Sequence, residues 1–211
     1  MKTDQLIRAL AADEVKRPSL DYLVIGALTI GAALSAMLFA WRIGLRPDIA
    51  VAAQDFRFIL KFLVTLALAV SAGSLLLRLV RPGLSRGIWI PTLLAGPIML
   101  AVGIGYELMA FAPSEWPARL IGRYSSFCLR SIPLLSAPIL IALLIALRQG
   151  APTRPALTGA VAGLASGAMG AFLYAAHCPD DSPLFVLAWY GLSIGAITVV
   201  GMLIGSRALR W

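Results

Sequence analysis

The sequence predicts an all-α polytopic membrane protein that forms a bundle of six transmembrane helices. Its 211 residues are 60% hydrophobic and 13% charged, whereas a soluble domain is about 45–50% apolar and about 25% charged. Six apolar segments approach the roughly 20 residues that a helix needs to cross a bilayer, and a segment in lipid must be helical to satisfy its backbone. The expected spans are residues 22–41, 58–79, 88–111, 127–147, 156–176 and 184–206.

Short links separate these spans. Each link contains proline, together with glycine, aspartate or serine, as in RPD at 46–48 and CPDDSP at 178–183. Such clusters mark loops, and links this short leave no room for a soluble domain. We therefore expect two parts, a cytoplasmic leader of residues 1–21 and a six-helix transmembrane domain of residues 22–211. The first span is too long for a cleaved signal-peptide core, so we expect it to be retained.

The distribution of basic residues predicts the topology. The net charge is +8, but the basic residues are scattered between apolar runs, which argues against direct binding of nucleic acid. With the N-terminus in the cytoplasm, 11 of the 18 lysines and arginines lie inside and the other 7 lie outside. The positive-inside rule therefore predicts that both termini are cytoplasmic (N-in, C-in).

Glycine and proline patterns indicate how the spans pack. Glycines recur every four residues in the last two spans, a spacing that lets helix backbones approach closely in lipid. We favour packing within the bundle over a dimer interface. The glycines are Gly159, Gly163, Gly167, Gly201 and Gly205. Prolines inside the spans predict kinks, at Pro91, Pro97, Pro133 and Pro138.

The link HCPDDSP, residues 177–183, gathers the chain's one histidine, one of its two cysteines and two aspartates. In the predicted topology this link lies on the periplasmic side, at the same membrane level as Cys128. Cys128 and Cys178 can form a disulfide in an oxidising compartment, provided that their Cα atoms come within roughly 7 Å.

Two other interpretations of this link remain open. Two thiolates and the imidazole of His177 suit Cu(I) or Zn(II), with Asp180 or Asp181 as an oxygen ligand. Alternatively, the polar residues of the link only cap the neighbouring helices. No catalytic motif occurs in the sequence, neither a nucleophile elbow, a zinc-protease signature, a Walker loop nor a carboxylate pair, so we predict no enzymatic activity and no catalytic residue.

Lys61 and Glu107 are ionisable residues inside the predicted spans. Lys61 is near the outer start of the second span and Glu107 near the outer end of the third. Charges at this depth are costly unless they are paired or hydrated. We therefore expect a structural ion pair between Glu107 and Lys61, or between Glu107 and Arg57. A proton path is the alternative, but few ionisable groups continue it inward.

The leader contains an apolar stripe at helical spacing. Leu6, Ile7, Leu10 and Ala11 fall on one face of a short helix that begins after Thr3. Three turns are only marginally stable alone in water. We therefore expect the stripe to bind either in a groove of a partner protein or on the membrane surface.

Over essentially its whole length the chain resembles the NrsF-type family of six-pass bacterial membrane proteins. The resemblance is carried by the run at 130–191, above all by GAPTRP at 150–155 and HCPDDSP at 177–183, with LIRALAAD at 6–13 and SRALRW at 206–211. Members are anti-sigma factors (negative regulators of sigma F). They hold an extracytoplasmic-function sigma factor at the inner membrane and release it under oxidising or heavy-metal stress.

The resemblance implies roles for residues of this chain. Cys128 and Cys178 match the family's two periplasm-side cysteines and are implied to sense the signal, with copper or zinc as a candidate signal ion and no cofactor required. The leader around Leu6 and Leu10 matches the segment implied to bind the sigma factor. The implied location is the inner membrane, where residues 22–211 serve as the sensor domain. The competing function class is a small-solute or metal transporter that uses the same outer cluster.

Overall fold

The computed structural model describes residues 5, 19–80, 91–150 and 152–210. The predicted leader helix and its stripe, Leu6, Ile7, Leu10 and Ala11, lie outside the described residues, so the structure does not test them. Within the described ranges the chain is helical and has no strand. The all-α prediction is therefore confirmed for this part of the chain.

Among the residues that the structure describes, six helices or helix groups are long and apolar enough to cross a membrane, as the sequence predicted. The predicted limits differ from those of the structure by three residues or fewer. The spans are α2 (Leu20–Arg42), α4 (Phe56–Leu79), η1 with α5 (Pro91–Leu94 and Ala95–Ala110), α7 (Ser125–Leu147), α8 (Pro155–Ala175), and α9, η3 and α10 (Pro183–Phe185, Val186–Tyr190 and Gly191–Ala208).

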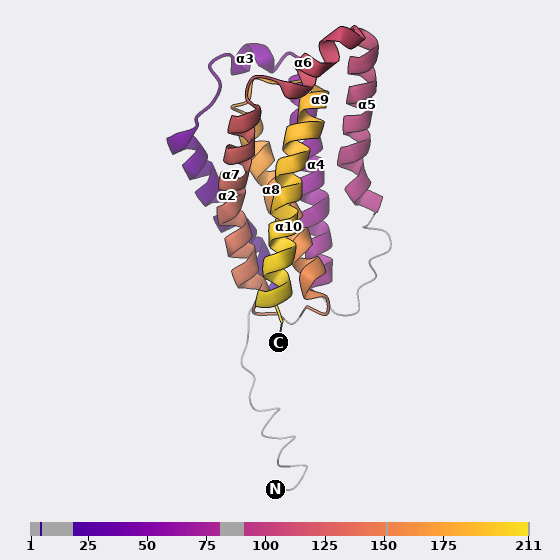
Figure 1. Cartoon of the computed structure of the whole chain (residues 1–211). Coiled ribbons are helices and arrows are strands. Elements are labelled where there is room, and N and C mark those ends of the chain that lie inside the picture. The colour runs from indigo at the N-terminus through magenta and orange to yellow at the C-terminus, as the bar shows by residue number, and fades with distance from the viewer. Residues whose placement is uncertain (1–4, 6–18, 81–90, 151, 211) are drawn as a thin grey trace.

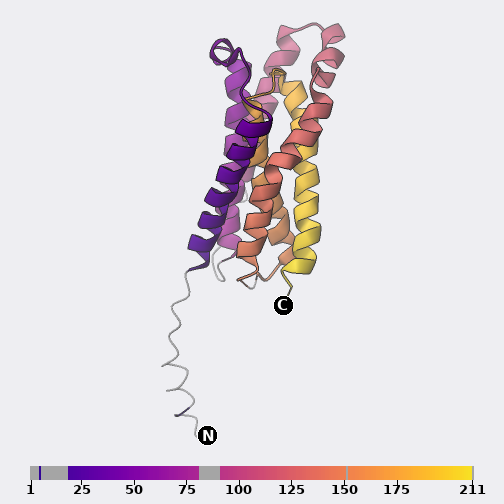
Figure 2. The same ribbon diagram turned by 90° about the vertical axis from the view of Figure 1, so that its left-hand side faces the viewer.

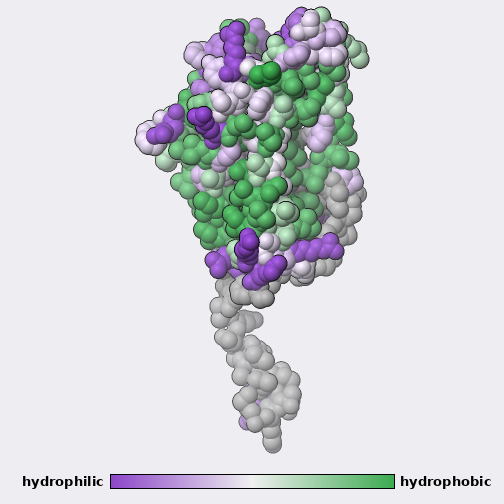
Figure 3. Space-filling model, viewed as in Figure 1, coloured by the Kyte–Doolittle hydropathy of each residue, from purple (hydrophilic) through white to green (hydrophobic). Residues whose placement is uncertain are grey.

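The spans run side by side, and short elements close one end of the bundle (Figure 1; Figure 2). We call this the cap end; it consists of residues 43–55 with α3 (Ile49–Ala52), residues 111–124 with η2 (Pro113–Glu115) and α6 (Trp116–Ile121), and residues 176–183. The start of α2 and the end of α10 lie at the opposite, terminal end. Hydrophobic residues cover the sides of the bundle, and hydrophilic residues gather at its two ends (Figure 3).

Helix α8 lies at the centre of the bundle and packs against α10, α4 and α7. In the most apolar 18-residue stretch of α8, 61% is buried inside the bundle. The corresponding share for the η1–α5 span is 17%, and this span packs on α4 at the edge of the bundle. A Cβ atom on Gly163 would lie 2.5 Å from the backbone oxygen of Ile197, and one on Gly205 would lie 2.7 Å from the Cα of Gly159. The glycine pattern therefore serves packing within the bundle, as predicted.

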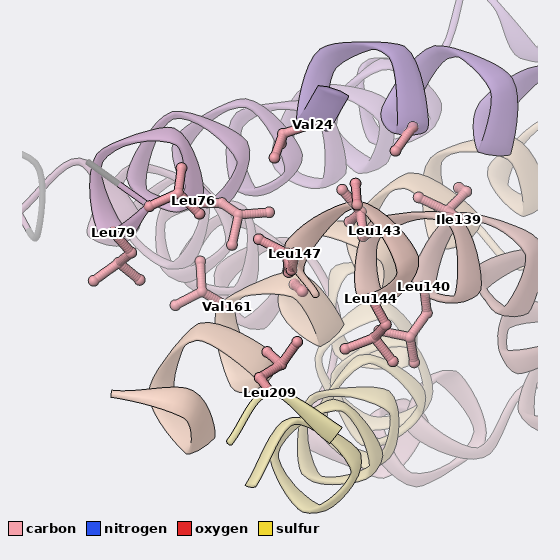
Figure 4. Close-up of a cluster of buried hydrophobic side chains, with 14 of the residues drawn as sticks. Val24, Leu76, Leu79, Ile139, Leu140, Leu143, Leu144, Leu147, Val161 and Leu209 are labelled. Carbon is pink, nitrogen blue, oxygen red and sulfur yellow. The ribbon is translucent and has the colours of Figure 1, made fainter. Parts of the chain in front are cut away.

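Two apolar clusters fill the interior. One occupies the terminal end, where side chains from α2, α4, α7, α8 and the end of the chain meet (Figure 4). The second lies toward the cap end and includes both cysteines with Tyr174, Phe185 and Tyr190. The cysteines are thus part of the packed core, beneath the segments that form the cap end.

Helix α2 packs closely on α7. A Cβ atom on Gly31 would lie 2.7 Å from the Cα of Ile139, and the hydroxyl of Ser35 donates a hydrogen bond of 2.6 Å to the backbone oxygen of Leu135. Helix α7 continues through Pro133 and Pro138. Cys128 lies in the first turns of α7 and belongs to the cluster near the cap end. Helix α7 therefore carries one of the cysteines and also packs on α2, the helix that follows the leader.

Candidate functional site

The segment 176–183, between α8 and α9, organises the cap end. The backbone N–H of Arg46 donates to the carbonyl of Ala176 at 3.1 Å. The carbonyl of Cys178 accepts two cationic donors, the Lys61 ammonium at 2.6 Å and the Arg46 guanidinium at 3.4 Å. One residue of this link therefore holds side chains from the α2–α3 connection and from α4.

Asp181 bridges the same two cations. Its carboxylate lies 2.8 Å from Arg46 and 2.5 Å from Lys61, whose side chain has no exposed surface. Asp48 binds the other side of Arg46 at 2.7 Å. The hydrogen bond from Arg46 lowers the pKa of Asp48 to about 2, and the two carboxylates raise the pKa of Arg46. Two positive and two negative groups thus balance one another, which a buried cation requires.

Asp180 fixes the start of α7. Its Oδ2 atom accepts hydrogen bonds from the backbone N–H groups of Arg123 at 3.0 Å and Tyr124 at 2.9 Å. The preceding residue, Gly122, has a φ of 61° and lies so close that a Cβ atom there would be 2.9 Å from Asp180 Oδ2. Glycine tolerates both this φ and this approach, which explains its presence at the turn.

Glu107 is fully buried, and its partners differ from the predicted one. Its carboxylate accepts hydrogen bonds from the Ser182 hydroxyl at 2.8 Å and the Leu184 backbone N–H at 3.2 Å, and it lies 3.4 Å from Arg119. Lys61 and Arg57, the two expected partners of Glu107, bind Asp181 and Asp55 instead. The link 176–183 supplies separate partners to Lys61 and to Glu107.

Cys128 and Cys178 are both free thiols, and neither has exposed surface. They belong to one core cluster although 50 positions separate them, so the structure brings the two predicted sensing thiols into the same region. The Cys178 thiol donates toward the carbonyl of Asp180 at 3.8 Å. Burial raises the pKa of Cys178, and the nearby charge of Lys61 opposes this shift. Both thiols are therefore protected from solvent in this conformation.

His177 has a structural environment of its own. Its Nδ1 atom lies 3.1 Å from the carbonyl of Gly44, and its ring packs 5.4 Å from Phe127 and 6.1 Å from Tyr174 between ring centroids. No group of three or more His, Cys, Asp or Glu side chains that could hold a metal ion is found among the described residues. The structure thus brings the thiols together, while Asp180 and Asp181 bind other parts of the cap end.

Sequence reasoning missed several residues of this region. Tyr174 and Tyr190 are buried in the same cluster as the two thiols, and the sequence did not single them out. Nor did it single out Arg46. Tyr190 ends the π-helix η3, an irregularity that is frequent at functional sites. The position of Arg46 could have indicated its role. It follows the first span directly and lies at the same end of the bundle as a link that carries two adjacent aspartates.

A polar cleft of about 800 Å³ opens at the cap end, outside the link. Its walls come from the start of α4, from α6 and the turn that follows it, and from residues 179–182. Basic and acidic side chains both line it, including Arg57, Arg119 and Asp180. Residues 179–182 of the link line the cleft, whereas the neighbouring Cys178 is buried.

The model of the family described as "Negative regulator of sigma F" (NrsF) matches residues 9–211. The chain belongs to the NrsF family. Over full length it is 35% identical to the probable anti-sigma-F factor NrsF of Azospira oryzae and 36% identical to the anti-sigma-F factor NrsF of Caulobacter vibrioides, with 100% of each chain covered. No solved structure matches the chain. Membership of NrsF confirms the resemblance that the sequence indicated and agrees with a regulatory rather than a catalytic role.

Proposed function

We propose that this protein is an anti-sigma factor of the bacterial inner membrane, which sequesters an extracytoplasmic-function sigma factor and releases it in response to periplasmic stress. Membership of the NrsF family carries the proposal, because both relatives that match over their full length are named as anti-sigma-F factors. Six helices of spanning length support the membrane location. In this proposal both termini are cytoplasmic, and the cap end faces the periplasm.

The leader, residues 1–21, is the proposed binding segment for the sigma factor. Its apolar stripe of Leu6, Ile7, Leu10 and Ala11 suits a groove on a protein partner, in which an amphipathic helix buries one face. Binding there keeps the sigma factor from core RNA polymerase. The chain needs no contact with nucleic acid to act in this way.

The proposed signal acts at Cys128 and Cys178. Their burial in one cluster and their free state suit either formation of a disulfide by an oxidant or capture of a thiophilic ion such as copper or zinc by two thiolates. His177, Asp180 and Asp181 are further candidate ligands, but each would first have to leave the partner it has in the structure. The signal must favour a conformation in which the leader binds less well, since a ligand shifts only states that it distinguishes.

The coupling route in this proposal runs through helix packing. Cys128 lies on α7, α7 packs on α2, and α2 directly follows the leader. A shift of α7 at the cap end therefore has a direct mechanical connection to the helix that anchors the leader. Couplings of this kind are typically about 1–3 kcal/mol, which changes the affinity of the second site by about 5–150-fold.

A tagged pull-down from native membranes tests the partner. The full chain is compared with a variant that lacks residues 2–17 and with two double variants, Leu6→Ser with Leu10→Ser on the apolar stripe and Gln5→Ser with Ala12→Ser on the opposite face. The proposal expects a sigma factor with the full chain and with the opposite-face control, and its loss from the other two samples. Absence of any sigma factor from the full-chain sample would instead favour the transporter interpretation, which transport assays in liposomes then examine.

Serine substitution tests the signal. A chain with Cys128→Ser and Cys178→Ser is expected to repress the sigma factor normally but to lose induction by oxidants and thiophilic metals, because serine provides neither a disulfide nor a soft ligand. The measurement is transcription from a promoter that depends on the sigma factor. Normal induction in the double-serine strain would refute the cysteine mechanism.

A further inference from the structure

The link between α8 and α9 has two sides with different surroundings. Residues 179–182 line the polar cleft on the outer side. On the inner side lies Cys178, which has no exposed surface and whose thiol donates toward the carbonyl of Asp180. The Cys178 sulfur therefore lies 3.8 Å from the backbone oxygen of Asp180, a residue that lines the cleft.

One contact of the link can be released without unpacking a helix. Asp180 holds the link against the turn before α7 through the backbone N–H groups of Arg123 and Tyr124, and these bonds are at the edge of the cleft. Gly122 permits this close packing, because a side chain at that position would collide with the ring of Phe185 and crowd the carboxylate of Asp180. The Asp180 end of the link therefore depends on two exposed hydrogen bonds and on one glycine.

The other contact is a firm anchor. Asp181 binds Arg46 and Lys61, which are buried, and the same two cations hold the carbonyl of Cys178. Breaking these contacts would leave a buried lysine without its carboxylate, which is far more costly than freeing backbone N–H groups at the edge of an open cleft. The link is consequently built to pivot at Asp181 and to open at Asp180.

We propose that residues 179–182 form a lid over the buried thiol pair, and that the polar cleft is the entrance through which a small, water-soluble, thiol-reactive species reaches Cys178. The lipid-facing route is less suited, because the thiols share their cluster with Phe185 and Tyr190, two large side chains that are at most 1% exposed. The inference deepens the proposed sensing function and rests on it for its biological meaning. The lid itself can be tested without a sigma factor.

The test measures how fast Cys178 is labelled in the full chain purified in lipid nanodiscs, in a Cys128→Ser background that leaves one thiol. Two reagents are used, a cationic methanethiosulfonate that does not enter lipid and N-ethylmaleimide, which does. The rate for the same chain unfolded in detergent is divided by the rate for the folded chain, which gives a protection factor for each reagent. Because a lid opening admits both reagents alike, the two protection factors are expected to agree.

Variants then locate the opening. Asp180→Ala is expected to raise both labelling rates by about tenfold or more, because it removes the acceptor of the two backbone hydrogen bonds from Arg123 and Tyr124. Glu115→Ala is the matched control, since it removes one negative charge from the same cleft but its carboxylate pairs with Arg119 and not with the lid. The control should label at the rate of the parent chain.

Two results would overturn the lid. The first is protection of Cys178 against the cationic reagent but not against N-ethylmaleimide, which would mean that reagents arrive through lipid. The second is labelling of the folded Asp180→Ala chain no faster than the Glu115→Ala control. If the variants do not show a cooperative thermal transition, the comparison of the two reagents on the parent chain decides. If the labelling results support the lid but the pull-down recovers no sigma factor, the proposed function is refuted and the inference about the lid is kept.

Discussion

The cap-end network makes an asymmetric prediction about stability. Asp181→Asn removes the carboxylate partner of Lys61, whose side chain has no exposed surface, and leaves that ammonium with the carbonyl of Cys178 alone. Lys61→Met leaves Asp181 bound to Arg46 at 2.8 Å. The first change strands a buried charge, whereas the second leaves the remaining carboxylate paired and partly hydrated.

The expected magnitudes follow from this difference. Removing one partner of a buried ion pair costs about 3–5 kcal/mol when the other charge is left uncompensated. We expect Asp181→Asn to approach this range. Lys61→Met should cost less, about 1–2 kcal/mol, because it deletes hydrogen bonds without leaving an unpaired charge. The double variant should be no worse than Asp181→Asn alone, since the stranded ammonium is then absent.

The assay is unfolding of the purified chain by titration with a denaturing detergent, followed by circular dichroism, with Glu115→Gln as a surface control. That residue forms an exposed pair with Arg119, and we expect its loss to change stability by less than about 1 kcal/mol. Equal effects of Asp181→Asn and Lys61→Met, or a double variant whose loss is the sum of the two, would refute the reasoning.

Three further predictions concern other parts of the molecule. Gly163→Ala should destabilise the chain by about 1–3 kcal/mol, because its Cβ would meet the backbone of α10. Gly195→Ala is the control, since a Cβ there meets open space and should not lower stability. Thermal unfolding compares the two variants. Ser35→Ala should cost about 0.5–1 kcal/mol by removing the hydrogen bond to Leu135, measured in the same way against the exposed Ser206→Ala. The lowered pKa of Asp48 means that its ionised form stabilises the fold above the usual pKa of 3.8, and that this contribution is lost as the pH falls through about 2. The melting temperatures of the parent chain and of Asp48→Asn should therefore differ at pH 5 and converge near pH 2.

The membrane spans were predictable because length and apolar content decide them. Lipid allows a spanning segment one backbone solution, so residues such as Leu20 to Arg42 needed no knowledge of their neighbours to be assigned as helix. The glycine spacing of the last two spans also predicted where α8 and α10 approach closely, since Gly163 and Gly205 act through local size alone.

The partners of the buried charges were not predictable in the same way. The sequence placed Lys61 and Glu107 at similar depth, but depth does not say which faces of α4 and α5 meet. The link 176–183 folds back between these helices and offers Asp181 to the lysine and Ser182 to the glutamate. A pairing that depends on a loop's path could be found only from the structure.

The candidate site was predicted in part. The topology argument put Cys128 and Cys178 at one level, and the structure has both thiols in one buried cluster. The topology argument could not reveal the partners of the two aspartates. Asp180 binds the turn before α7 and Asp181 binds Arg46 and Lys61, and each partner lies more than 50 positions away in the sequence. The tyrosine hydroxyls beside the thiols were missed because aromatic residues in a span look like ordinary core.

The most direct test of the account is the affinity of the full chain, reconstituted in nanodiscs, for the purified sigma factor with and without signal. We predict that an oxidant or a copper salt weakens binding at least about fivefold in the parent chain, and leaves the affinity of a chain with Cys128→Ser and Cys178→Ser unchanged. An affinity that does not respond in the parent chain, or that falls equally in the double-serine chain, would contradict the account.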